Sequence, residues 1–162
     1  MVNYRRARVP GAACFFTVTL RDRRKSTLID RADLLRSVVR SVWHDRRFGI
    51  EAAVVLPDHL HAICTLPPGD ADYSGRWRAI QARFSRALAG RGVPIVRNRR
   101  GEYDLWQRRF WEHLIRDVSS WGFSVSPCVG GLLDGVVAWQ DLELAVVSCG
   151  EAAAVLTTHD DI

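Results

Sequence analysis

Residues 54–67, VVLPDHLHAICTLP, combine a strongly apolar run with two histidines, His59 and His61, separated by a single leucine. Pro57 and Asp58 interrupt the run, so it predicts two β-strands joined by a short turn, with the histidine pair at the start of the second strand. Side chains at positions i and i+2 of a strand project from the same face. The segment therefore predicts two imidazoles standing side by side on a sheet.

Two neighbouring imidazoles make up half of a metal site. Histidine is the commonest metal ligand at neutral pH, and an ion held by two imidazoles needs one or more further protein groups, with open positions for a substrate oxygen. The alternative is that both histidines are ordinary strand residues that bind water or a carbonyl group. The pair alone does not decide between these interpretations.

The sequence before this segment predicts one strand and one helix. Residues 13–20, ACFFTVTL, are rich in β-branched and aromatic residues and predict the first strand. Apolar residues recur at helical spacing over residues 31–47, where Asp30 is a candidate N-cap, and Gly49 follows the end of this helix. Residues 50–56 and 60–66 are the two strands on either side of the turn.

The sequence after the histidine segment predicts a second helix and a last strand. Trp77 and Phe84 belong to an apolar stripe over residues 73–89, and such a stripe usually packs in the core. The other faces of this helix carry Arg76, Arg78, Arg83 and Arg86. Residues 105–115 predict a last strand or a strand-to-helix transition. The order β-α-β-β-α-β predicts an α+β fold, a ferredoxin-like antiparallel sheet with helices on one face.

Positive charge is concentrated in the first part of the chain. All 23 Lys and Arg residues and 12 of the 18 acidic residues lie within residues 1–117, which therefore carry a net charge of +11, whereas residues 118–162 carry −6. Only one of the 23 is a lysine. An arginine-rich surface favours a phosphate backbone as partner, because arginine binds phosphate oxygens with two N–H groups and stacks on bases. The alternative is a solvated basic face.

Length and composition limit the class of protein. A chain of 162 residues is long enough for one domain with a core of its own. The four cysteines show no C-x-x-C spacing, the basic N-terminus lacks the pattern of a signal peptide, and no uncharged apolar run reaches the length of a membrane span. We therefore expect a cytoplasmic protein in a reducing environment, with no membrane partner.

Three stretches together resemble one known family. They are YRRARVPG followed by FFTVTL, then VVLPDHLHAICTLPPGDADYSGRWRAIQARFSRAL, then WQRRFWEHLIRD. This pattern, which covers about residues 4–117, is similar to the REP-associated tyrosine transposases, a branch of the HUH single-strand DNA transposases. The resemblance implies a ferredoxin-like domain that binds hairpin DNA from repetitive extragenic palindromes and cuts the single strand beside the stem.

The resemblance also implies roles for particular residues. His59 and His61 match the HUH histidines, which would hold Mg²⁺ or Mn²⁺ against the scissile phosphate while a tyrosine hydroxyl attacks it. Exposed aromatic side chains would stack on unpaired bases. The arginines expected to contact DNA phosphates are Arg5, Arg6, Arg78, Arg83, Arg86, Arg108 and Arg109.

The family pattern ends at Asp117. In the family a segment of the form Tyr-Ile-His-x-Asn-Pro-Val supplies the nucleophile, but residues 118–162 contain no tyrosine, and Tyr4, Tyr73 and Tyr103 lie outside the nucleophile's position. The sequence therefore identifies no catalytic nucleophile. A frameshift near residue 117 would explain the changed composition of this tail, and a diverged C-terminal extension is the alternative. Reading the other frames of the coding DNA distinguishes the two.

Three functions follow from these observations. The first is a REP-associated tyrosine transposase-like protein that binds single-stranded or hairpin DNA, with metal-dependent strand cleavage implied by the resemblance. The second is a nucleic-acid-binding module without catalytic activity, because the nucleophile is missing. The third is a metal hydrolase that activates water at the histidine pair, which lacks a visible carboxylate-rich ligand set.

Overall fold

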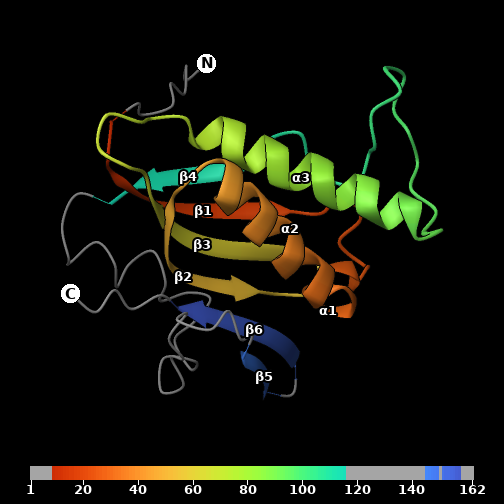
Figure 1. The fold of residues 1–162 in the computed structure, drawn as a ribbon. Coiled ribbons are helices and arrows are strands. Elements are labelled where there is room, and N and C mark those ends of the chain that lie inside the picture. The colour runs from red at the N-terminus through yellow and green to blue at the C-terminus, as the bar shows by residue number, and fades with distance from the viewer. Residues whose placement is uncertain (1–8, 116–144, 150, 158–162) are drawn as a thin grey trace, which may run out of the picture.

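An antiparallel sheet with helices on one face forms the frame of the protein (Figure 1). The structure is a computed structural model that describes residues 9–115, 145–149 and 151–157. Its elements are β1 (Ala13–Thr19), α1 (Thr27–Asp30), α2 (Ala32–Asp45), β2 (Gly49–Val55), β3 (His59–Thr65), α3 (Tyr73–Gly90), β4 (Trp111–Leu114), β5 (Ala145–Cys149) and β6 (Glu151–Thr157). In this described part of the chain, no helix has the length and apolar character needed to cross a membrane.

The first four strands confirm the predicted ferredoxin-like fold. They lie in the order β4-β1-β3-β2, and all three neighbouring pairs are antiparallel. The helices α2 and α3 connect β1 to β2 and β3 to β4, and both cover the same face of the sheet (Figure 1). In the tail, β6 pairs antiparallel with β2, and β5 pairs with β6. The sheet is thereby extended beyond β2, while β4 forms the opposite edge.

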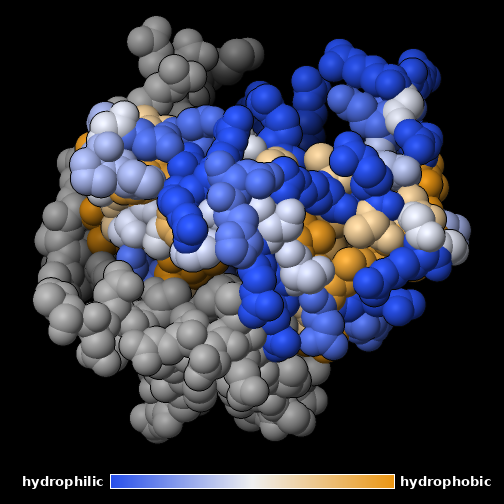
Figure 2. Space-filling view, in the orientation of Figure 1, coloured by the Kyte–Doolittle hydropathy of each residue, from blue (hydrophilic) through white to orange (hydrophobic). Residues whose placement is uncertain are grey.

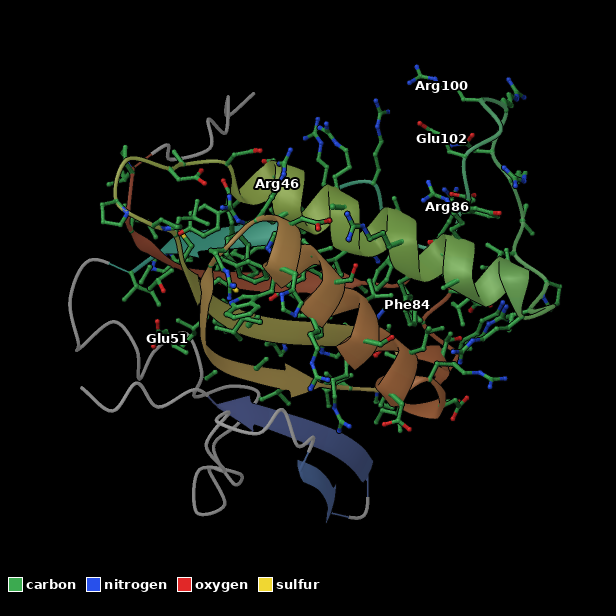
Figure 3. The ribbon with its side chains drawn as sticks, viewed as in Figure 1. Arg46, Glu51, Phe84, Arg86, Arg100 and Glu102 are labelled. Carbon is green, nitrogen blue, oxygen red and sulfur yellow. The ribbon has the colours of Figure 1, made fainter. Side chains whose placement is uncertain are left out.

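The main core lies between the sheet and the helices. Alternation along the strands directs Phe16 of β1 and Leu60 of β3 toward the helices, where they join Trp77 and Phe84 of α3. The prediction that these two aromatic residues belong to the core is confirmed, since Trp77 is 6% exposed and Phe84 is fully buried. Figure 3 shows Phe84 below α3, on the side that faces the sheet.

The helix predicted over residues 31–47 is α2, but Asp30 does not cap it. The N-cap position is Arg31, whose side chain makes no capping hydrogen bond. Asp30 instead ends the one-turn helix α1, and its carboxylate accepts a hydrogen bond from the Ser26 hydroxyl at 2.6 Å. The prediction was wrong because a single sequence gave no sign of this additional helical turn. The Asp30 carboxylate makes its hydrogen bond within that turn and not with α2.

Arg76 is buried, contrary to its predicted place on an outer face of the second helix. Its guanidinium donates to the Asp70 carboxylate at 2.6 Å, to the Arg47 carbonyl at 2.8 Å and to the Asp72 carbonyl at 3.1 Å. The Asp72 side chain also caps α3 by accepting from the backbone N–H of Gly75 at 2.8 Å. Arg76 therefore ties the start of α3 to the end of α2 instead of facing a ligand.

The strand predicted over residues 105–115 is much shorter in the structure. Only Trp111–Leu114 forms β4, and the preceding Trp106 meets Leu20 in an isolated bridge. The buried Trp106 indole donates hydrogen bonds to the Gln81 carbonyl and the Ser85 hydroxyl of α3, at 3.2 and 3.1 Å. This segment holds the end of β1 against α3 before the chain enters the edge strand.

Candidate metal and nucleic-acid site

The two histidines lie on the face of the sheet that carries no helix in the part of the chain that the structure describes, called here the helix-free face. Leu60 and Ala62 of β3 point into the helix-covered core, so His59 and His61 between them point to the other side. Their ring centroids are 4.9 Å apart, and the ring planes are nearly perpendicular. The predicted same-face arrangement is confirmed.

Asp58 and Arg23 orient His59. The Nδ1 atom of His59 lies 2.7 Å from one carboxylate oxygen of Asp58, and the other oxygen accepts a hydrogen bond from Nε of Arg23 at 2.7 Å. Desolvation opposes ionisation of Asp58, but the hydrogen bonds from Arg23 and His59 outweigh it and lower the pKa of this carboxyl group. An ionised Asp58 accepts from Nδ1–H, which leaves Nε2 as the lone-pair nitrogen of His59.

Thr17 holds the second histidine through the same ring atom. Nδ1 of His61 lies 2.9 Å from the Thr17 hydroxyl on the neighbouring strand, its direct cross-strand partner. Nε2 of His61 is buried and has no hydrogen-bond partner among the described residues. Burial, and then the charge of His59, lower the pKa of His61 to about 4, so the ring is neutral at pH 7.

This arrangement fits a shared divalent cation. A neutral imidazole whose Nδ1 is engaged and whose Nε2 is free is the form that ligates metal ions. The ring centroids are 4.9 Å apart, which is close enough for one ion to contact both imidazoles. Within residues 9–115, however, no third His, Cys, Asp or Glu joins them in a metal-binding cluster.

Neither tyrosine in the described chain is placed to attack a phosphate at this pair. Tyr73 lies in the helix-covered core, where its hydroxyl donates to the Ala12 carbonyl and burial raises its pKa. The ring of Tyr103 lies in the loop between α3 and β4, with the Arg97 guanidinium 4.1 Å from its centroid. Tyr4 falls outside the described residues.

The predicted DNA-contacting arginines of α3 lie on the helix-bearing side of the sheet, away from the histidines. Arg78 and Arg86 are exposed, and no hydrogen bond or ion pair holds either one in the described chain. Figure 3 shows Arg86 on the outer side of α3, and Figure 2 shows that hydrophilic side chains dominate this view of the molecule. Arg83 is engaged instead, by the Ser41 hydroxyl at 2.6 Å and by Asp45, both on α2.

Two other predicted arginines lie at the histidine end of the sheet. The backbone N–H of Gln107 donates to the carbonyl of Thr19, and Thr19 is the cross-strand partner of His59. Arg108 and Arg109 follow directly, and both are exposed. Arg5 and Arg6 fall outside the described residues. The structure therefore brings one arginine pair toward the histidines and separates the helix arginines from them.

Sequence reasoning missed the residues that orient the histidines. Asp58 was visible in the segment PDHLH, where an acid next to a candidate metal ligand is a signal for an orienting partner. Thr17 and Arg23 had no such signal, because their roles depend on strand register and on the loop after β1. Trp111 and His113 were also missed. They stack on the helix-free face with ring centroids 5.8 Å apart.

Comparison with known proteins identifies the family of this chain. No protein-family model matches the chain. A REP-associated tyrosine transposase of Escherichia coli K12 is 43% identical over 121 residues, which are 75% of this chain and 66% of that protein. An inferred REP-associated tyrosine transposase of Haemophilus influenzae is 40% identical over 119 residues, 72% of this chain and 68% of that protein. The chain belongs to the REP-associated tyrosine transposases.

Solved structures agree with this family assignment. A REP-associated tyrosine transposase bound to a REP hairpin superposes with a TM-score of 0.67 at 39% identity, over 81% of this chain and 75% of that one. An inferred transposase of Deinococcus radiodurans shares the fold, with a TM-score of 0.52 at 14% identity over 75% of this chain and 92% of that one. The chain spans about two thirds of the length of its two curated relatives.

Proposed function

We propose that this chain binds hairpin DNA with a single-stranded flank, next to a divalent cation held by His59 and His61. The observation that carries the proposal is the state of the histidine pair: both Nδ1 atoms are engaged, and no group in the described part of the chain bonds the buried Nε2 of His61. Such an arrangement is costly unless a ligand fills it, because an unpaired buried polar atom loses its hydration without compensation.

The cation would be Mg²⁺ or Mn²⁺, and it would neutralise charge on a bound phosphate. His59 and His61 would ligate it through Nε2, while Asp58 and Thr17 keep both rings oriented. Arg108 and Arg109, at the same end of the sheet, would bind neighbouring phosphates of the strand. The hairpin complex of the family member 39% identical to this chain supports DNA of this type as the partner.

Two forms of this function differ in catalysis. In the first, the chain cleaves the DNA strand as a transposase, although its sequence identifies no nucleophilic tyrosine. In the second, the chain is a non-catalytic nucleic-acid-binding module. The second form is favoured by Tyr73, whose hydroxyl is buried and bonded, and by the absence of tyrosine after Tyr103 in the sequence. We assign the DNA-binding unit to residues 1–117 and treat residues 118–162 as a separate tail.

The distribution of charge supports this proposal. Residues 1–117 carry all the lysine and arginine residues of the chain, as a phosphate-binding unit requires.

The test uses an end-labelled REP-type hairpin with a single-stranded flank and a scrambled strand of equal length as control. In Mn²⁺, we expect preferential binding of the hairpin and a steep loss of affinity with salt, because several phosphates are neutralised. Denaturing electrophoresis then separates the two forms: a covalent protein–DNA species indicates cleavage, and intact DNA indicates the module. Absent or salt-insensitive binding would contradict the proposed function.

A further inference from the structure

An unbroken series of aromatic rings crosses the helix-free face of the sheet. His61 stacks on Phe15 with centroids 5.4 Å apart, and Phe15 meets Trp111 edge-on at 5.8 Å. Trp111 in turn stacks on His113 at 5.8 Å with ring planes only 6° apart. The series therefore runs from the candidate metal ligand on β3, across β1, to the edge strand β4.

The strand register explains why these rings meet. Thr17 of β1 lies directly between His61 on one side and Trp111 on the other, and Phe15 pairs with His113. Trp111 and His113 are two residues apart on β4 and so share a face. The arrangement is fixed by backbone pairing, and it does not depend on a flexible loop.

The two ends of the series differ in their access to solvent. Phe15 and His61 are 5% and 6% exposed, whereas the large indole of Trp111 is 54% exposed and His113 is also exposed. A tryptophan this accessible gains little from the core, which favours a role in recognising a planar, apolar ligand. Because β4 forms the edge of the sheet opposite the tail strands, a ligand can approach the rings along this edge.

The charge near Trp111 and His113 identifies the class of ligand. Arg108 and Arg109 are exposed immediately before β4 and make no ion pair in the described part of the chain. Aromatic rings beside unpaired cations are the arrangement that binds single-stranded nucleic acid, in which bases stack and phosphates pair with arginine. A duplex would present only its backbone here, since its bases are stacked on one another.

We infer that Trp111 and His113 form a stacking platform for one unpaired base of the DNA strand held at the histidine pair. This inference rests on the proposed function and adds residues to its site. Two strand spacings of about 4.8 Å separate β4 from β3, so the platform lies roughly 10 Å from His61. At about 3.4 Å per stacked nucleotide, the stacked base lies within about three nucleotides of the phosphate at the cation. The platform would thus fix the register of the strand.

The first measurement compares Trp111→Ala and Trp111→Phe with the wild-type chain, on a hairpin that carries the single-stranded flank. Loss of one stacking contact lowers affinity by about 5- to 150-fold. Trp111→Phe retains most of the affinity, because phenylalanine still presents a ring. The salt dependence of binding is unchanged in Trp111→Ala, since no phosphate contact is removed. The matched control is Trp43→Ala, another exposed tryptophan, which lies on α2.

The second measurement needs no variant and therefore does not depend on folding. Wild-type protein is titrated with hairpins that carry one abasic site at each flank position in turn. We expect an abasic site at one flank position to lower the affinity of the wild-type protein as much as Trp111→Ala does. On the hairpin that carries this abasic site, Trp111→Ala should bind with the same affinity as the wild-type protein. The platform is wrong if the wild-type protein binds the intact hairpin and two further affinities equal that one: the affinity of the wild-type protein for every abasic hairpin, and the affinity of Trp111→Ala for the intact hairpin. If wild-type protein does not bind at all, the proposed function itself fails.

Discussion

The two faces of the sheet differ in how charge and chemistry are distributed. The helix-bearing face displays Arg78 and Arg86 on α3, and its interior consists mainly of packed apolar residues, with Tyr73, Arg76 and Ser85 buried among them. The helix-free face holds the oriented histidine pair and the rings of Trp111 and His113. The exposed arginines of α3 therefore do not mark the face that holds the oriented histidines.

The difference has a physical reason. Long arginine side chains on a helix are readily solvated, and they can face any direction without a specific partner. A metal-binding imidazole needs a fixed tautomer and orientation, which only neighbouring groups can provide. The pairing of strands β1 and β3 places such neighbouring groups beside the histidines. The helix-free face is therefore the one on which the imidazoles are held in a fixed orientation.

The largest expected effect concerns the pH dependence of the helix-free face. His61 has a pKa of about 4 in the folded chain, against about 6.5 when unfolded, so the unfolded chain binds more protons between these values. In the metal-free protein, the contribution of neutral His61 to the free energy of unfolding is therefore fully present above pH 6.5 and is lost as the pH drops toward 4. The loss contributed by this residue reaches about 3 kcal/mol.

Urea denaturation in EDTA at pH 7.0 and pH 4.5 measures this loss, with His61→Gln and the surface variant His44→Gln compared at both values. His61→Gln should show a smaller decrease than the wild-type chain, because the depressed pKa is removed. His44→Gln, on the helix-bearing side of the molecule, should behave like the wild type. An equal pH dependence in all three chains would contradict the assigned environment of His61.

An intermediate effect is expected for Asp58, which orients His59. In Asp58→Asn the carboxylate that accepts from Nδ1–H is replaced by an amide, so the favoured tautomer of His59 is no longer enforced. Affinity for Mn²⁺, measured by isothermal titration calorimetry, should fall by about 10- to 100-fold. The matched control is Asp33→Asn on α2, an exposed carboxylate paired with Arg36. Unchanged affinity in Asp58→Asn would remove the orienting role.

The smallest effect compares single arginines from the two faces. Removing one phosphate contact should lower the slope of log affinity against log salt by about 0.7 to 0.9. We expect this decrease in Arg108→Ala and Arg109→Ala, which lie at the histidine end of the sheet. Arg78→Ala and Arg86→Ala, with equal charge loss on α3, should change the slope less. The comparison between faces fails if the α3 variants show the larger decrease in hairpin binding.

Arg83 shows that helical spacing, even where it places a residue correctly, does not reveal the partners of its side chain. Helical spacing correctly placed it away from the core of α3, but its guanidinium is engaged by Asp45 and the Ser41 hydroxyl of α2. Arg76 was misassigned for the same reason, since its partners Asp70 and Arg47 come from different parts of the chain. Pairing between elements is a long-range property that periodicity does not encode.

The sequence by itself determined the order of the first four strands and the two long helices, the apolar stripe of α3, the same-face placement of His59 and His61, and the family. These depend on local alternation and on short motifs, which a single chain displays directly. Only the tertiary structure decided that Thr17 and Asp58 fix the two imidazoles, that the α3 arginines lie on the other side of the sheet, and that Trp111 continues the series of rings from His61. Each of these depends on strand register and on which face the helices cover, and both arise from contacts between residues far apart in the chain.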